Sequence, residues 1–150
     1  MLRDIFWGLP WWQAGCMARA VRQPVVLMKW YRVVSWMLDR VDHFPKNQRF
    51  VFGQRLAERS IHVLELVVEA TWSQDKTAIL AQANREMEVL RWLVRLAHDR
   101  KILTAKQYEA AAEGIYECGR MVGGWQKDSQ RRAASSPPPR STSKRDPEKP

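Results

Sequence analysis

Two arginines spaced four residues apart, Arg91 and Arg95, are the side chains of this sequence best suited to binding a ligand. Residues at this spacing lie on one side of a helix, one turn apart. Asn84 projects onto the same edge at about 100° per residue. Each guanidinium is a planar fork that matches phosphate oxygens, so this edge predicts contacts with two adjacent phosphates of a nucleic acid. The alternative is ordinary solvated charge, or an ion pair with Glu88, which projects between the two arginines.

A second basic edge precedes the first in the chain. Arg55, Arg59 and His62 fall on one side of an expected helix, and Arg49 lies apart from them. We expect Arg55 and Arg59 to support the phosphate contacts of the first edge.

Residues with catalytic or metal-binding chemistry are sparse. The three histidines lie on three different segments, without the spacing that metal ligands show, and Cys16 and Cys118 form no disulfide framework. Gly123-Gly124 lacks the residues that surround a phosphate-binding loop. The acidic residues of the last helix repeat at helical spacing and are explained by a solvated face. We therefore expect no enzyme, no cofactor and no metal, and a reducing cytoplasmic setting.

Four amphipathic helices account for most of the chain. They are expected over 24–44, from about 45 to 72, over 79–100 with Asp75 as a possible N-cap, and from a Thr104–Gln107 capping box to about Gly123-Gly124. Short loops between them predict an all-α, up-down-up-down four-helix bundle. The apolar stripe expected for the first helix is Leu27, Tyr31, Val34, Leu38 and Val41. That of the second includes the small residues Gly53, Ala57 and Ser60, and Cys118 belongs to the core stripe of the fourth.

The 79–100 helix has two apolar faces. Its main stripe is Leu80, Ala83, Met87, Leu90, Val94 and Ala97, and a separate patch consists of Val89, Trp92, Leu93 and Leu96. One alternative is a helix buried on both sides within its own domain. We favour self-association through the patch, because so small a domain has little surface with which to enclose a helix.

The two ends of the chain differ from the middle. Residues 1–24 form an N-terminal extension, rich in Trp and broken by Gly and Pro, that we expect to be dispensable for the fold; a secretory signal or a true start at Met17 are alternatives. No segment is suited to span a membrane. The bundle covers 25–127, and 128–150 is expected to be a disordered basic tail rich in Pro and Ser. The formal net charge of +9 divides into +2, +4 and +3 over these three parts.

Three segments carry a resemblance to a known family. FPKNQRF at 44–50, ANREMEVLRWLVRLA at 83–97 and GRMVGGW at 119–125 make residues 25–127 similar to the accessory variability determinant (Avd) of diversity-generating retroelements. The resemblance implies a basic four-helix protomer without catalytic activity that forms a barrel-like homopentamer. Its implied partners are the retroelement reverse transcriptase and the template-repeat RNA, which it assists in error-prone cDNA synthesis. By position, Arg91 and Arg95 match the family's paired arginines, and Arg49 and Arg55 its basic positions in the second helix.

Two other classes of protein remain as alternatives. The related bundle proteins encoded in intervening sequences of 23S ribosomal RNA genes share the Phe-Pro entry but carry a small-residue SIPANIAEG-like signature, whereas this chain has SIHVLELVVEA at 60–70. A purely structural helical adaptor would bind no nucleic acid. Salt-dependent RNA binding separates the adaptor from the other two classes.

Overall fold

A computed structural model describes residues 24–135 of the 150-residue chain. The expectations for the N-terminal extension up to residue 23, and for the tail over 136–150, concern segments outside the described residues. The described part contains α2 (Val25–Asp42), α3 (Lys46–Gln48), the π-helical turn η1 (Arg49–Gly53), α4 (Gln54–Trp72), α5 (Thr77–Asp99) and α6 (Ala105–Ser135).

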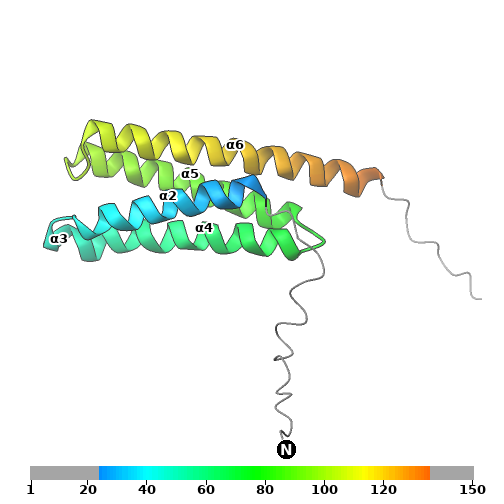
Figure 1. The fold of residues 1–150 in the computed structure, drawn as a ribbon, viewed down its shortest axis with the longest axis horizontal. Coiled ribbons are helices and arrows are strands. Elements are labelled where there is room, and N and C mark those ends of the chain that lie inside the picture. The colour runs from blue at the N-terminus through cyan, green and yellow to red at the C-terminus, as the bar shows by residue number, and fades with distance from the viewer. Residues whose placement is uncertain (1–23, 136–150) are drawn as a thin grey trace, which may run out of the picture.

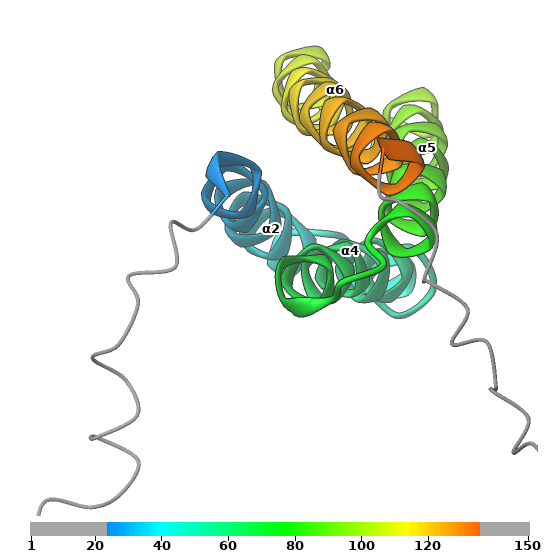
Figure 2. The same cartoon turned by 90° about the vertical axis from the view of Figure 1, so that its right-hand side faces the viewer.

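The four long helices form one up-and-down bundle, as the sequence predicts (Figure 1). Contacts join α2 to α4, α4 to α5, α5 to α6 and α6 to α2, so each helix touches its neighbours around the bundle. Figure 2, which looks along the bundle, shows this order. Within residues 24–135, no helix is long and apolar enough to cross a membrane.

The core stripe of α5 is the one that its periodicity predicts. All six residues of the stripe are buried, at 0–1 % exposure: Leu80, Ala83, Met87, Leu90, Val94 and Ala97. The helix begins at Thr77, two residues before the predicted start, and the backbone N–H of Thr77 donates to Asp75 Oδ1 at 3.3 Å. Lys76, not Asp75, occupies the N-cap position.

The predicted core stripe of α2 is confirmed at Val34 and Val41 and is wrong by one position at its other three residues. Tyr31 is 56 % exposed and Leu38 is 36 % exposed, whereas Trp30 and Met37 are fully buried. Nearly every turn of α2 carries apolar residues on more than one face, so periodicity alone admits more than one rotation of the helix. The buried residues of α2 are Val26, Trp30, Val34, Met37 and Val41.

The second predicted helix is interrupted near its start. After Pro45 the chain forms α3 and then the π-helical turn, and regular α-helix resumes at Gln54. Gly53 is buried at this junction, where a Cβ atom would lie 2.8 Å from Val41 Cγ1. A glycine is therefore needed for the close approach of α2, as the small-residue pattern indicates.

The last helix is longer than predicted. Its N-terminus has the expected capping box: Thr104 N donates to Gln107 Oε1 at 3.0 Å, and Gln107 N donates to Thr104 Oγ1 at 3.3 Å. The helix does not stop near Gly123-Gly124 but continues to Ser135, beyond the ends of its neighbours (Figure 1). Neither glycine has a positive φ, and Asp128 pairs with two arginines one turn later, which supports helix over 128–135.

Candidate nucleic-acid interface

Arg91 and Arg95 lie one turn apart on α5 and are partly exposed. Arg91 Nη1 is 3.0 Å from Glu88 Oε2, and Arg95 Nε is 3.9 Å from Asp99 Oδ2. The ion pair with Glu88 thus forms for Arg91 only. Both pairs join exposed side chains on a single helix, and such pairs contribute little to stability. An anionic ligand can therefore exchange for either carboxylate at small cost.

The edge of α5 that carries Arg91 faces α6. The Arg91 guanidinium carbon lies 5.9 Å from the centre of the Tyr116 ring on α6. Asn84 Nδ2 donates to Gln126 Oε1 at 3.2 Å, and the His98 ring stacks on that of Tyr108, with centroids 4.9 Å apart. We call this line of contacts the α5–α6 seam. Its side chains come from both helices, so a ligand here would contact both.

The basic residues before α5 take different positions. Arg59 forms an ion pair with Glu86 across the contact between α4 and α5. Arg49 Nη2 donates to the backbone oxygen of Asp42 at 2.6 Å and to that of Phe44 at 3.2 Å. Arg49 therefore satisfies carbonyl groups left open at the end of α2.

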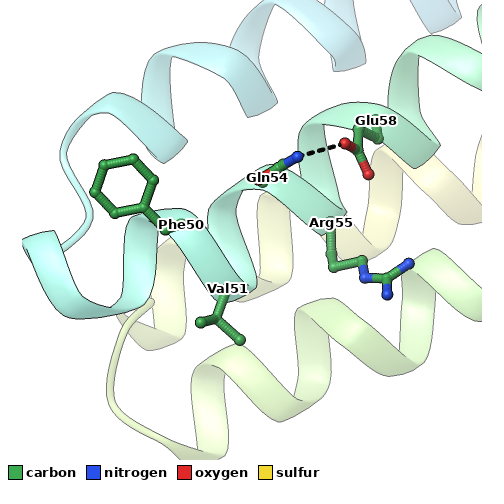
Figure 3. Close-up of a pocket in the computed structure, with 5 residues that line it drawn as sticks. All are labelled: Phe50, Val51, Gln54, Arg55 and Glu58. Carbon is green, nitrogen blue, oxygen red and sulfur yellow. Dashed lines mark hydrogen bonds between the residues drawn. The ribbon is translucent and has the colours of Figure 1, made fainter.

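Arg55 lies beside the π-helical turn. Figure 3 shows it with exposed Phe50 and Val51, and with Gln54 donating a hydrogen bond to Glu58 at 2.7 Å. Among residues 24–135, Arg55 has no ion-pair or hydrogen-bond partner. Phe50 is 77 % exposed and Val51 is 69 % exposed, an apolar pair that sequence analysis did not identify as a surface feature.

The predicted basic residues are thus divided between two sides of α5. Arg91 and Asn84 contact α6, whereas Arg59 pairs with Glu86 on the side of α5 that faces α4. One protomer does not gather all of them on a single patch. A surface that uses both sets has to extend around α5 or combine residues of different copies.

The second apolar face of α5 is open in the single chain. Trp92 is 65 % exposed, Leu96 46 % and Val89 39 %, while Leu93 is half-buried against the core. These four line a shallow depression together with Arg95 and Asp99. Within residues 24–135, the alternative of a helix buried on both sides in its own domain is therefore wrong for α5.

Tyr116 and Arg120 of α6 were not predicted as site residues from the sequence. Tyr116 is 56 % exposed, and Arg120, one turn later on α6, has its guanidinium carbon 5.9 Å from the Tyr116 ring centre. Their spacing of four places them on one face of a helix and was the available signal. Their proximity to Arg91 depends on the relative orientation of α5 and α6 in the bundle. The residue pattern of a single helix does not predict that orientation.

The Cys118 thiol is buried in the core, and its pKa reflects that burial. Burial raises the pKa of the Cys118 thiol from 9.0 to about 11, with the nearby Glu117 charge adding to the effect and Lys29 opposing it. Cys118 is 1 % exposed within the core, as predicted. No group of three or more His, Cys, Asp or Glu side chains within residues 24–135 is arranged to hold a metal ion.

Comparison with known proteins identifies one family. A family model described as bAvd-like matches residues 24–129, which is the whole bundle except the last six residues of α6. No curated protein matches the sequence.

Proposed function

The chain belongs to the bAvd-like family, and we propose from this that it is a non-catalytic accessory protein of a diversity-generating retroelement. In this role it binds the template RNA and the reverse transcriptase, and it supports mutagenic cDNA synthesis in the cytoplasm. The family match over residues 24–129 carries the proposal, and the bundle itself agrees with it.

The proposed RNA contacts are made chiefly by Arg91 and Arg95. Their partners are exposed carboxylates on the same helix, so phosphate oxygens can replace them without uncovering a buried charge. Asn84 and Arg55 add polar and basic groups on either side of α5. Arg59 and Arg49 already have protein partners, and in this proposal they hold helices in place while still contributing to the local positive potential.

Assembly of several copies would raise the positive charge that attracts RNA. Residues 25–127 contain sixteen Lys and Arg and twelve Asp and Glu, a difference of +4. A ring of five copies would carry about +20 and a correspondingly stronger field for RNA. We propose that the patch of Val89, Trp92, Leu93 and Leu96 is the contact between copies, because an exposed apolar surface around a tryptophan is typical of an interface.

Reconstituted cDNA synthesis tests the proposal. The cognate reverse transcriptase and template RNA are incubated with the wild-type protein, without it, or with the Arg91→Ala, Arg95→Ala double variant. We expect cDNA yield to depend on the wild-type protein and to fall with the variant, provided that the variant remains helical and assembled. Equal yields with and without the wild-type protein would reject the accessory role. A gene for a reverse transcriptase and a repeat pair beside this gene is the matching genomic observation.

A further inference from the structure

We propose that Tyr116 is a stacking platform for a base of single-stranded RNA, with Arg91 and Arg120 beside it to bind the adjoining phosphates. This inference rests on the proposed RNA binding and adds a defined contact site on α6. The site is the Arg91–Tyr116–Arg120 cluster of the α5–α6 seam.

The geometry of the cluster is that of an aromatic ring with a cation on each of two helices. The guanidinium carbons of Arg91 and Arg120 each lie 5.9 Å from the Tyr116 ring centre. Cations at this distance are attracted to the ring, so they stay near it. Tyr116 is nevertheless 56 % exposed, which leaves ring surface for a further contact.

Arg91 is packed against the protein at its Nε and is partly open to solvent. Its Nη1 is bound to Glu88 at 3.0 Å, while its Nε is buried without a hydrogen-bond acceptor among the described residues. About 40 % of its side chain is accessible to solvent. A phosphate oxygen can take the place of Glu88 at the solvent-accessible side of this guanidinium, whose planar fork matches phosphate oxygens.

The seam continues beyond the cluster with a second ring pair. His98 of α5 stacks on Tyr108 of α6, eight residues before Tyr116 and so about 12 Å away along the helix. In the sequence of α5, Arg95 lies between Arg91 and His98, and its side chain borders the depression that it lines with Trp92 and Leu96. Aromatic rings and arginines on neighbouring turns of one surface are the pattern of a protein that binds single-stranded nucleic acid, because bases stack on rings while cations follow the backbone.

Stacking of a base on the Tyr116 ring favours single-stranded RNA over duplex RNA as the ligand. The faces of bases are hidden by stacking within a duplex, and a ring on a protein surface cannot reach them. The competing explanation is that the two arginines only fasten α5 to α6. In that case a substitution at Tyr116 would change the stability of the bundle. It would not weaken binding to single-stranded RNA more than binding to duplex RNA.

The test compares Tyr116→Leu, which removes the ring, with Tyr116→Phe, which keeps it. Tyr31→Leu is the matched control, because Tyr31 is also 56 % exposed but lies on α2 and has no part in the Arg91–Tyr116–Arg120 cluster. Each full-length variant is titrated into a single-stranded RNA oligonucleotide containing 2-aminopurine, whose fluorescence reports stacking, and into a duplex of the same sequence. Circular dichroism and thermal melting verify that the variants fold.

We expect Tyr116→Leu to weaken single-strand binding by on the order of tenfold and to lose the stacking signal. Its dependence on salt should keep the wild-type slope, since no phosphate contact is removed. Tyr116→Phe and Tyr31→Leu should bind as wild type does, and duplex affinity should be unchanged throughout. Wild-type affinity and stacking signal in a folded Tyr116→Leu variant would overturn the inference.

The arginine double variant separates this inference from the proposed function. If Arg91→Ala with Arg95→Ala abolishes RNA binding while Tyr116→Leu changes nothing, phosphate binding stands and stacking is rejected. A wild-type protein that binds no single-stranded RNA would reject both.

Discussion

The indole Nε1–H of Trp30 donates a hydrogen bond of 3.0 Å to the backbone oxygen of Ser60, joining α2 to α4 inside the core. Both residues are fully buried. This bond fixes the rotation of α2, because the buried indole has to point at α4 to satisfy its only polar atom.

Trp30→Phe is expected to destabilise the bundle by about 1–3 kcal/mol. The substitution removes the hydrogen bond and leaves unfilled volume beside Ser60. Denaturant unfolding followed by circular dichroism measures the difference. Trp72→Phe is the control, because Trp72 is 73 % exposed and the same change there should stay within about 0.5 kcal/mol of wild type. Equal stability of the two variants would show that the buried bond contributes nothing.

Gly53→Ala and Gly124→Ala should have opposite effects on stability. At Gly53 the new methyl group would lie 2.8 Å from Val41 Cγ1, so the Val41 side chain or the backbone has to shift, at a cost of about 1–3 kcal/mol. At Gly124 no neighbouring atom lies within 4 Å, and the gain in helix propensity should stabilise by up to about 1 kcal/mol. Thermal unfolding of both variants checks the sign. A stabilised Gly53→Ala would mean that the junction of η1 and α4 adapts more easily than its geometry indicates.

The elements that sequence reasoning predicted well are those with one unambiguous apolar stripe. On α5 charged residues separate the main stripe from the second patch, so only one rotation buries the stripe. On α2 the apolar residues surround much of the helix, and the hydrogen bond of Trp30 with Ser60, a contact between distant segments, selects the rotation. The π-helical turn and the extension of α6 to Ser135 also depend on features that periodicity does not report.

The site was predicted only along single helices. The spacing of Arg91 and Arg95 follows from helix geometry and is present in the structure. The contact of Arg91 with Tyr116 and the pairing of Arg59 with Glu86 join different helices, and they depend on how neighbouring helices align. The distribution of the basic residues over two sides of α5 therefore could not be predicted from the spacing within single helices.

Trp92→Asp is expected to block assembly without unfolding the protomer. Trp92 is 65 % exposed, so the bundle does not need it, whereas a carboxylate in a dry contact between copies would be costly. Light scattering should give a multiple of the protomer mass for wild type and a smaller mass for the variant. Trp72→Asp, an equally drastic change on the exposed end of α4, should assemble normally. A wild-type protein that is monomeric at micromolar concentration would contradict the proposed interface.

Cys118 should make stability fall at high pH. Its pKa is 9.0 when unfolded and about 11 in the bundle, so between these values the unfolded chain releases a proton that the folded chain retains. Fewer bound protons in the unfolded state mean that stability decreases as pH rises from about 9 to about 11. The loss should be on the order of 1–3 kcal/mol. Urea unfolding across this range, compared with Cys118→Ala, isolates the thiol from other titrating groups, and parallel curves for the two proteins would contradict it.

Arg91→Ala combined with Arg95→Ala should reduce RNA affinity for many sequences alike. Phosphates carry no sequence information, so their loss weakens binding uniformly and flattens its dependence on salt. Each phosphate contact removed from a single strand should lower the slope of log K against log salt by about 0.7. Arg32→Ala with Arg100→Ala removes the same charge from other positions and controls for net charge alone. If both double variants weaken binding equally, RNA responds only to the overall field of the protein. A smaller slope confined to the Arg91, Arg95 variant, in a protein that is still helical and assembled, would place the phosphate contacts on this edge of α5.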